Sequence, residues 1–192
     1  MSLTRRNVLV GFFPLAGLAA CASPNPALYT LAGVPGEARA GGARLVELRQ
    51  IGLPEYLDRP GIVRSAQNYQ LQLAQDDRWA APLGSMLTRV LVEDLSQRLP
   101  GSTVYSVTGA ISAPPDRIVE VDLQRFDADQ GGDVVLAAVV AVRSPQGKAG
   151  VVARPVRIPV RPKSPSTADF AAALSAAVGE LADTIADVLR RA

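Results

Sequence analysis

Residues 117–142, RIVEVDLQRFDADQGGDVVLAAVVAV, decide the fold of this chain. Over 117–126, apolar residues at 119, 121 and 123 alternate with acids and glutamine at 120, 122 and 124. This period of two predicts a strand with one buried and one solvated face. The turn signal QGGD at 130–133 leads into nine uninterrupted apolar residues, 134–142. Their valine content predicts a second strand, covered on both faces.

The sequence downstream of this hairpin predicts a third strand and a helix. Residues 151–160 continue as a strand, and Pro155 and Pro159 predict that it is either an edge strand or interrupted, because proline cannot donate a ladder hydrogen bond. Thr167 is a plausible helix cap, and the apolar residues from 170 to 189 recur with helical spacing.

Upstream, the pattern predicts shorter strands and one more helix. Strands are expected over 43–51 and 102–107, and over 69–73 leucines alternate with glutamines as in a half-buried strand. Leucines keep a helical period over 83–99, where Pro100-Gly101 ends the helix. The expected fold is therefore α+β: a two-layer sandwich of a mostly antiparallel sheet with two main amphipathic helices on one side.

The N-terminus has the order of a bacterial lipoprotein signal. Arg5 and Arg6 precede an apolar stretch, residues 8–20, which ends in small residues directly before Cys21. A stretch of 13 residues is short for a membrane span, which needs roughly 20. An ordinary cleaved signal and a twin-arginine export route remain alternatives. The expected division is a signal peptide over 1–20, lipidated Cys21 with a flexible tether over 21–42, and one domain over 43–192. Within the tether, residues 28–31 could form a first strand or a docking element.

Composition argues against catalysis and against nucleic-acid binding. The chain has no histidine and one cysteine, which removes the usual general base and the usual soft metal ligands. Without residues 1–20 its 20 basic residues become 18, which balance 18 acids, so no basic surface for nucleic acid is indicated. Glu120 and Asp122 could act as a catalytic pair, but a solvated strand face explains them better. No catalytic residue, metal or cofactor is expected.

Several stretches together resemble the ABC-transport auxiliary lipoprotein family. They are the Cys21 motif, Tyr29-Thr30-Leu31, the run LPEYLDRP at 53–60, Arg64, the glutamine-rich strand and Trp79. The resemblance implies a non-catalytic, lipid-anchored protein on the periplasmic face of the outer membrane, where Ala22 agrees with that sorting. Its implied partners are an MCE-domain protein and an ABC or inner-membrane component in (phospho)lipid transport, on which it would dock as an oligomer.

Candidate partner-binding residues come from the same stretches, although packing within the domain would explain each of them equally well. They are Leu53, Pro54, Tyr56, Leu57, Asp58, Arg59, Pro60 and Trp79. Two other functions stay open: a lipoprotein plug or assembly factor for an outer-membrane barrel, and a lipid-anchored periplasmic hydrolase that uses the carboxylates.

Overall fold

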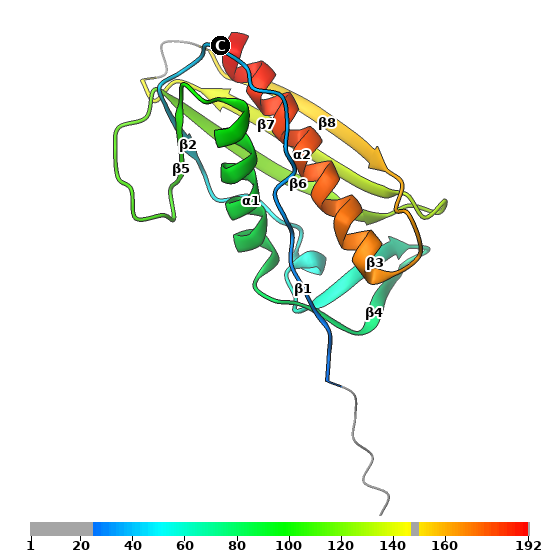
Figure 1. Ribbon diagram of the computed structural model, residues 1–192. Helices are drawn as coiled ribbons and strands as arrows, with labels where there is room; N and C mark the ends of the chain where they lie inside the picture. Colours follow the sequence, from blue (N-terminus) through cyan, green and yellow to red (C-terminus); the bar gives the residue numbers. More distant parts are fainter. Residues whose placement is uncertain (1–24, 147–149, 192) are drawn as a thin grey trace, which may run out of the picture.

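The computed structural model describes residues 25–146 and 150–191. In these residues eight strands form one mixed sheet, and two helices lie together on one of its faces (Figure 1). The α+β class expected from the sequence is confirmed. The elements are β1 (Leu28–Tyr29), β2 (Leu45–Leu48), the 3-10 turn η1 (Glu55–Leu57), β3 (Gly61–Gln67), β4 (Gln70–Trp79), α1 (Leu83–Arg98), β5 (Thr103–Ser106), β6 (Arg117–Ala128), β7 (Val134–Arg143), β8 (Val152–Val160) and α2 (Thr167–Arg191).

Strand β6 is the centre of the sheet. One side of it pairs antiparallel with β7 along its whole length, and β7 pairs antiparallel with β8. The other side is shared, because β2 runs parallel to its first residues and β3 meets Ala128 at its end. The three long strands are thus antiparallel, as expected, while the short strands β1, β2 and β5 add parallel pairs.

The core lies between the sheet and the helices. The inner faces of β6 and β7 supply valines and leucines that are at most 3% exposed, and α1 and α2 cover them with their apolar stripes. The other face of β7 differs from the expectation that both faces would be covered. Val135 at the start of this face is fully buried, but Ala137, Val139 and Ala141 are only half-buried, because both described α-helices lie on the opposite face of the sheet.

Strand β8 occupies the edge that its prolines predicted. Among the described residues it pairs with β7 alone, and Pro155 and Pro159 are both exposed. Proline removes backbone donors from the strand, which hinders pairing with another chain.

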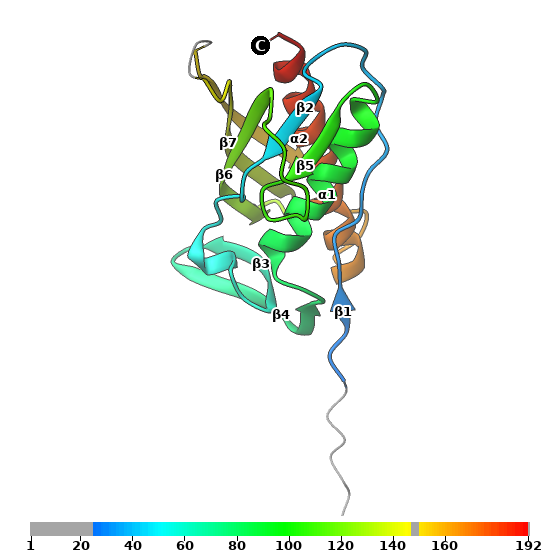
Figure 2. The ribbon, with the colours of Figure 1, turned by 90° about the vertical axis from the view of Figure 1, so that its left-hand side faces the viewer.

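The β3–β4 hairpin projects from the rest of the sheet (Figure 2). The strand expected around residues 69–73 is present, but its apolar face is not buried: Leu71 is 43% and Leu73 is 46% exposed. The helices do not extend over this part of the sheet, so the alternation that usually marks a buried face here marks an open one.

Residues 28–39, called the strap below, pack against the helices instead of forming a flexible tether. The strap runs along α1 and α2 (Figure 1). Leu31 is fully buried, and the N–H of Ala32 donates to Ser175 Oγ in α2. The structure therefore packs residues that the sequence placed in the tether, because their partners on α1 and α2 are far along the chain and composition does not reveal them.

A buried arginine fastens the strap to both helices. Arg98 of α1 is 1% exposed, and its guanidinium donates to Asp183 of α2 at 2.9 and 3.2 Å and to the Val34 carbonyl at 3.0 Å. Arg39 donates to the same Asp183 at 2.7 Å. Burial opposes ionisation of Asp183, but the hydrogen bonds from the two arginines outweigh it and hold the pKa of Asp183 below its ordinary value.

A carboxylate completes this attachment. Asp94 of α1 accepts the Val34 N–H at 2.8 Å, so both backbone groups of Val34 are paired with α1 side chains. Burial raises the pKa of Asp94, against the opposing effect of the Val34 N–H and Arg98.

Gly36 is expected to tolerate no side chain. A Cβ atom there would overlap the Arg98 guanidinium, which its hydrogen bonds hold in place. We expect Gly36→Ala to lower the free energy of unfolding by about 1–3 kcal/mol, as overpacking does. The matched control is Gly84→Ala in the first turn of α1, where a Cβ meets nothing within 4 Å and helix propensity improves. Urea unfolding would check both, and equal stability of the two variants would contradict this view of the strap.

Candidate docking site

Five of the eight predicted partner-binding residues line two adjoining hollows beside η1, which together are called the notch below: Leu53, Asp58, Arg59, Pro60 and Trp79. The loop over residues 52–60 leaves β2, passes β6 and returns toward β3. Gly52 fixes its start: the Gly52 N–H donates to the Val121 carbonyl, and the Leu123 N–H donates to the Gly52 carbonyl, both at 2.9 Å. A Cβ at this position would press on Asp122 Oδ1 at 2.5 Å, so the close approach suits glycine.

The loop is rigid because its own backbone is hydrogen-bonded. Pro54 starts the 3-10 turn, in which the Leu57 N–H donates to the Pro54 carbonyl at 2.9 Å. At the loop's end the Trp79 N–H donates to the Pro60 carbonyl at 2.8 Å, which joins the loop to β4. The positions of the side chains between these points are therefore set by the fold.

The eight candidate residues divide by burial. Leu57 is 2% and Trp79 is 7% exposed, so both belong to the hydrophobic core. Leu53, Pro54 and Tyr56 are half-buried, while the side chains of Asp58, Arg59 and Pro60 are exposed. Packing within the domain accounts for Leu57 and Trp79, and the three consecutive exposed residues are the part of the loop that a partner could reach.

Tyr56 is tied to the sheet. Its hydroxyl donates to Asp127 Oδ2 at 2.9 Å, and Arg125 Nε donates to the other oxygen of this carboxylate at 2.6 Å. Burial, with the negative charge of Asp127 beside it, raises the pKa of Tyr56 well above its ordinary value. Tyr56 thus anchors the loop as a neutral hydrogen-bond donor.

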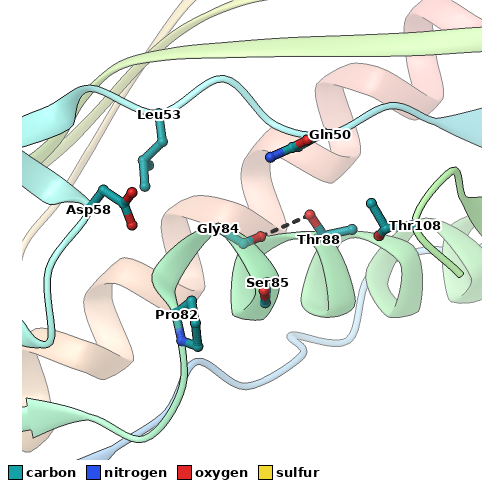
Figure 3. A pocket seen from close by; sticks show the side chains of 8 residues that line it. All are labelled: Gln50, Leu53, Asp58, Pro82, Gly84, Ser85, Thr88 and Thr108. Atoms are coloured by element: carbon teal, nitrogen blue, oxygen red, sulfur yellow. Dashed lines mark hydrogen bonds between the residues drawn. The ribbon is translucent and has the colours of Figure 1, made fainter.

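Two hollows flank the exposed residues. The first has a volume of about 380 Å³ and lies between the loop and the start of α1 (Figure 3). Its lining is mostly small and polar: Gln50, Leu53, Asp58, Pro82, Gly84, Ser85, Thr88 and Thr108. Thr88 Oγ1 donates to the Gly84 carbonyl at 2.8 Å, as Figure 3 shows.

The second hollow, about 290 Å³, adjoins the first at Asp58 and Pro82. It is lined by Asp58, Arg59, Pro60, Trp79, Ala81 and Pro82, four of which are predicted partner-binding residues. The two hollows together form the notch. Sequence reasoning missed Gln50, Ser85, Thr88 and Thr108, because ordinary polar residues from three separate segments meet here only in the folded chain.

The notch combines charged and apolar side chains. Asp58 and Arg59 give one charge of each sign next to the apolar Pro60 and Pro82. Among the described residues no cluster of three His, Cys, Asp or Glu side chains has a metal-binding arrangement. Neither described helix has the length and apolar run that a membrane crossing needs.

The carboxylate pair lies elsewhere. Glu120 and Asp122 are on the outer face of β6, and Glu120 forms an ion pair with Arg143 at 3.0 Å. The Asp122 side chain is exposed. Cys21 and the predicted signal segment lie outside the described residues.

Comparison with known proteins gives consistent matches. A family model described as an ABC-type transport auxiliary lipoprotein component matches residues 29–186. The intermembrane transport lipoprotein PqiC of Escherichia coli K12 is 30% identical over 96 residues, which are 50% of this chain and 50% of that protein. PqiC of Shigella flexneri matches to the same extent. The chain therefore aligns with about half the length of these curated relatives.

Solved structures share the fold. An uncharacterized protein superposes with a TM-score of 0.71 at 21% identity, covering 85% of this chain and 98% of that one. A protein of Xanthomonas campestris superposes with a TM-score of 0.62 at 18% identity, covering 82% and 91%. The family match begins at residue 29, inside the strap, which agrees with the strap being part of the domain.

Proposed function

Because the chain belongs to the family of ABC-type transport auxiliary lipoprotein components, we propose that it is a non-catalytic, lipid-anchored docking subunit of an MCE/ABC-type intermembrane lipid transport system. Cys21 carries the lipid, and the anchor lies in the outer membrane on its periplasmic face. The domain docks as an oligomer on the MCE-domain protein, which works with an ABC or inner-membrane component. The name of its relatives, intermembrane transport lipoprotein, supports this role.

The observation that carries the docking part is the rigid, exposed tripeptide Asp58-Arg59-Pro60. Arg59 lines a hollow together with the apolar Pro60, Trp79, Ala81 and Pro82. Arginine is enriched at protein interfaces, and a fixed loop loses little entropy when a partner binds it. The notch thus combines an exposed charged residue with a preformed cavity.

Copurification tests this proposal. We expect the tagged, lipidated protein, extracted from its own host in mild detergent, to bring along an MCE-domain protein and its ABC or membrane partner. Mass spectrometry would identify them. Recovery of an outer-membrane barrel instead would favour the plug function, and recovery of the protein alone would reject the docking proposal.

Arg59→Glu tests the notch itself. We expect it to reduce partner recovery by about tenfold or more. Loss of an interface arginine, with a charge of opposite sign in its place, weakens the binding free energy by about 1.4 kcal/mol or more. Arg154→Glu on the exposed edge strand β8 is the matched control and should leave recovery unchanged. Equal recovery with both variants would move the docking surface away from the notch.

A further inference from the structure

Large exposed apolar side chains gather along the β3–β4 hairpin. Tyr69 at its tip is fully exposed, and Leu71 and Leu73 follow it on β4 with 43% and 46% exposed. Leu71 and Leu73 are two apart on β4 and so share a face, which Ala66, the partner of Leu71, extends onto β3, while Tyr69 lies next to them in the turn. We call Tyr69, Leu71 and Leu73 the hairpin patch. Large contiguous apolar patches are uncommon on free surfaces and mark contacts.

The hairpin holds this patch stiffly. Asn68 and Tyr69 have φ values of 50° and 62°, so the two strands are joined by a tight two-residue turn with left-handed backbone at both central positions. Gln67 Nε2 donates to the Ala128 carbonyl at 2.8 Å, which ties the tip to the end of β6. The patch is therefore presented on a fixed strand.

The position of the hairpin indicates what covers it. Both ribbon views show the β3–β4 hairpin and β1 at the same end of the molecule (Figures 1 and 2). The strap is packed from Leu28 onward, so only the seven residues 21–27 separate the lipidation residue from the folded domain. Seven residues span at most about 25 Å when fully extended. The anchor therefore holds the hairpin end close to the bilayer.

We propose that the hairpin patch rests on the surface of the lipid bilayer that holds the Cys21 lipid. This inference rests on the lipid anchor in the proposed function. The exposed Leu28 of β1 pairs with Arg78, toward the end of β4 that lies away from Leu71, and exposed Asp76 lies between that pair and the patch along the strand. A short tether gives the patch a high effective concentration at the membrane, so a contact too weak to bind a free protein is enough to orient an anchored one.

Single-cysteine labels can test the contact in the full lipidated protein. Cys21 is the only native cysteine, and its thiol is consumed by the lipid, so an introduced cysteine takes an environment-sensitive fluorophore alone. Leu71→Cys places the label on the patch, Gln72→Cys on the opposite face of β4, and Ile111→Cys on an exposed loop outside the hairpin. After reconstitution into phosphatidylethanolamine/phosphatidylglycerol vesicles, we expect a blue-shifted, brighter emission from the label at 71, compared with detergent solution, and little change at 72 and 111.

A second variant guards against effects of the label. Tyr69→Ser with Leu73→Ser, added to Leu71→Cys, should abolish the blue shift, whereas Val151→Ser should not. An unshifted label at 71 in lipidated, vesicle-bound protein would overturn the inference and leave the proposed function standing. Equal shifts at 71 and 72 would also overturn it, because another protein chain would then enclose the hairpin. A protein whose mass lacks the lipid would instead remove the anchor on which both proposals depend.

Discussion

Replacing Arg98 by alanine is expected to lower the free energy of unfolding by about 3 kcal/mol or more, the scale found when one partner of a buried ion pair is removed. Arg98 satisfies Asp183, the Val34 carbonyl and the Asp94 carbonyl at once. Without it, the strap loses its attachment to α1, and Asp94, whose Oδ2 is buried without a hydrogen-bond partner, loses its nearby positive charge.

Urea unfolding followed by far-UV circular dichroism would measure the effect. Arg154→Ala is the control, because this exposed arginine of β8 should change stability by less than about 0.5 kcal/mol. If Arg98→Ala and Arg154→Ala unfold at the same urea concentration, the network around Asp183 does not hold the strap.

Trp79→Ala is expected to lower the free energy of unfolding by about 3–5 kcal/mol, as removal of a large buried aromatic side chain does. Trp79 is 7% exposed and lies in the core at the end of β4. Its backbone N–H donates to the Pro60 carbonyl, and the alanine variant keeps this hydrogen bond. The loss of stability would arise from the cavity left by the indole ring. Because Trp79 also lines the notch, we expect partner binding to fall together with stability.

The comparison with Arg59→Ala separates packing from docking. Arg59 is exposed, so its removal should change stability by less than about 0.5 kcal/mol while weakening partner recovery. A Trp79→Ala protein with wild-type stability but no partner binding would show that the tryptophan is a docking residue, contrary to its burial.

The sequence predicted best the elements whose signals are local. The alternation over β6, the glycines of the following turn and the valine run of β7 each depend on residues close in the chain, and the structure confirms that hairpin. The edge position of β8 followed from two prolines for the same reason. In each case the physical cause acts between neighbours.

The predictions that depended on distant contacts were the weak ones. Leu71 and Leu73 have the spacing of a buried face, but whether a helix covers them is decided by where α1 and α2 end. Leu31 is buried although it lies in an Ala-, Pro- and Gly-rich segment. This part of the strap is hydrogen-bonded to distant residues: Arg89 donates to the Leu31 carbonyl, and the Ala32 N–H donates to Ser175. In the candidate site, the loop over 53–60 was found from its sequence. The notch residues on α1, Ser85 and Thr88, could not be predicted, because they meet the loop only in the folded chain.

The strap can pack against the helices only late in folding. Its partners include Ser175 and Asp183, which are 143 and 144 residues further along the chain than Ala32 and Arg39. A growing or threading chain releases these residues last, so the strap cannot dock until nearly the whole protein has emerged. Closing so long a loop is also slow compared with forming the local β6–β7 hairpin. Residues 28–39 therefore stay unpacked while the rest of the domain forms. For the lipid attachment that we propose at Cys21, this delay would leave time before the strap packs against the helices.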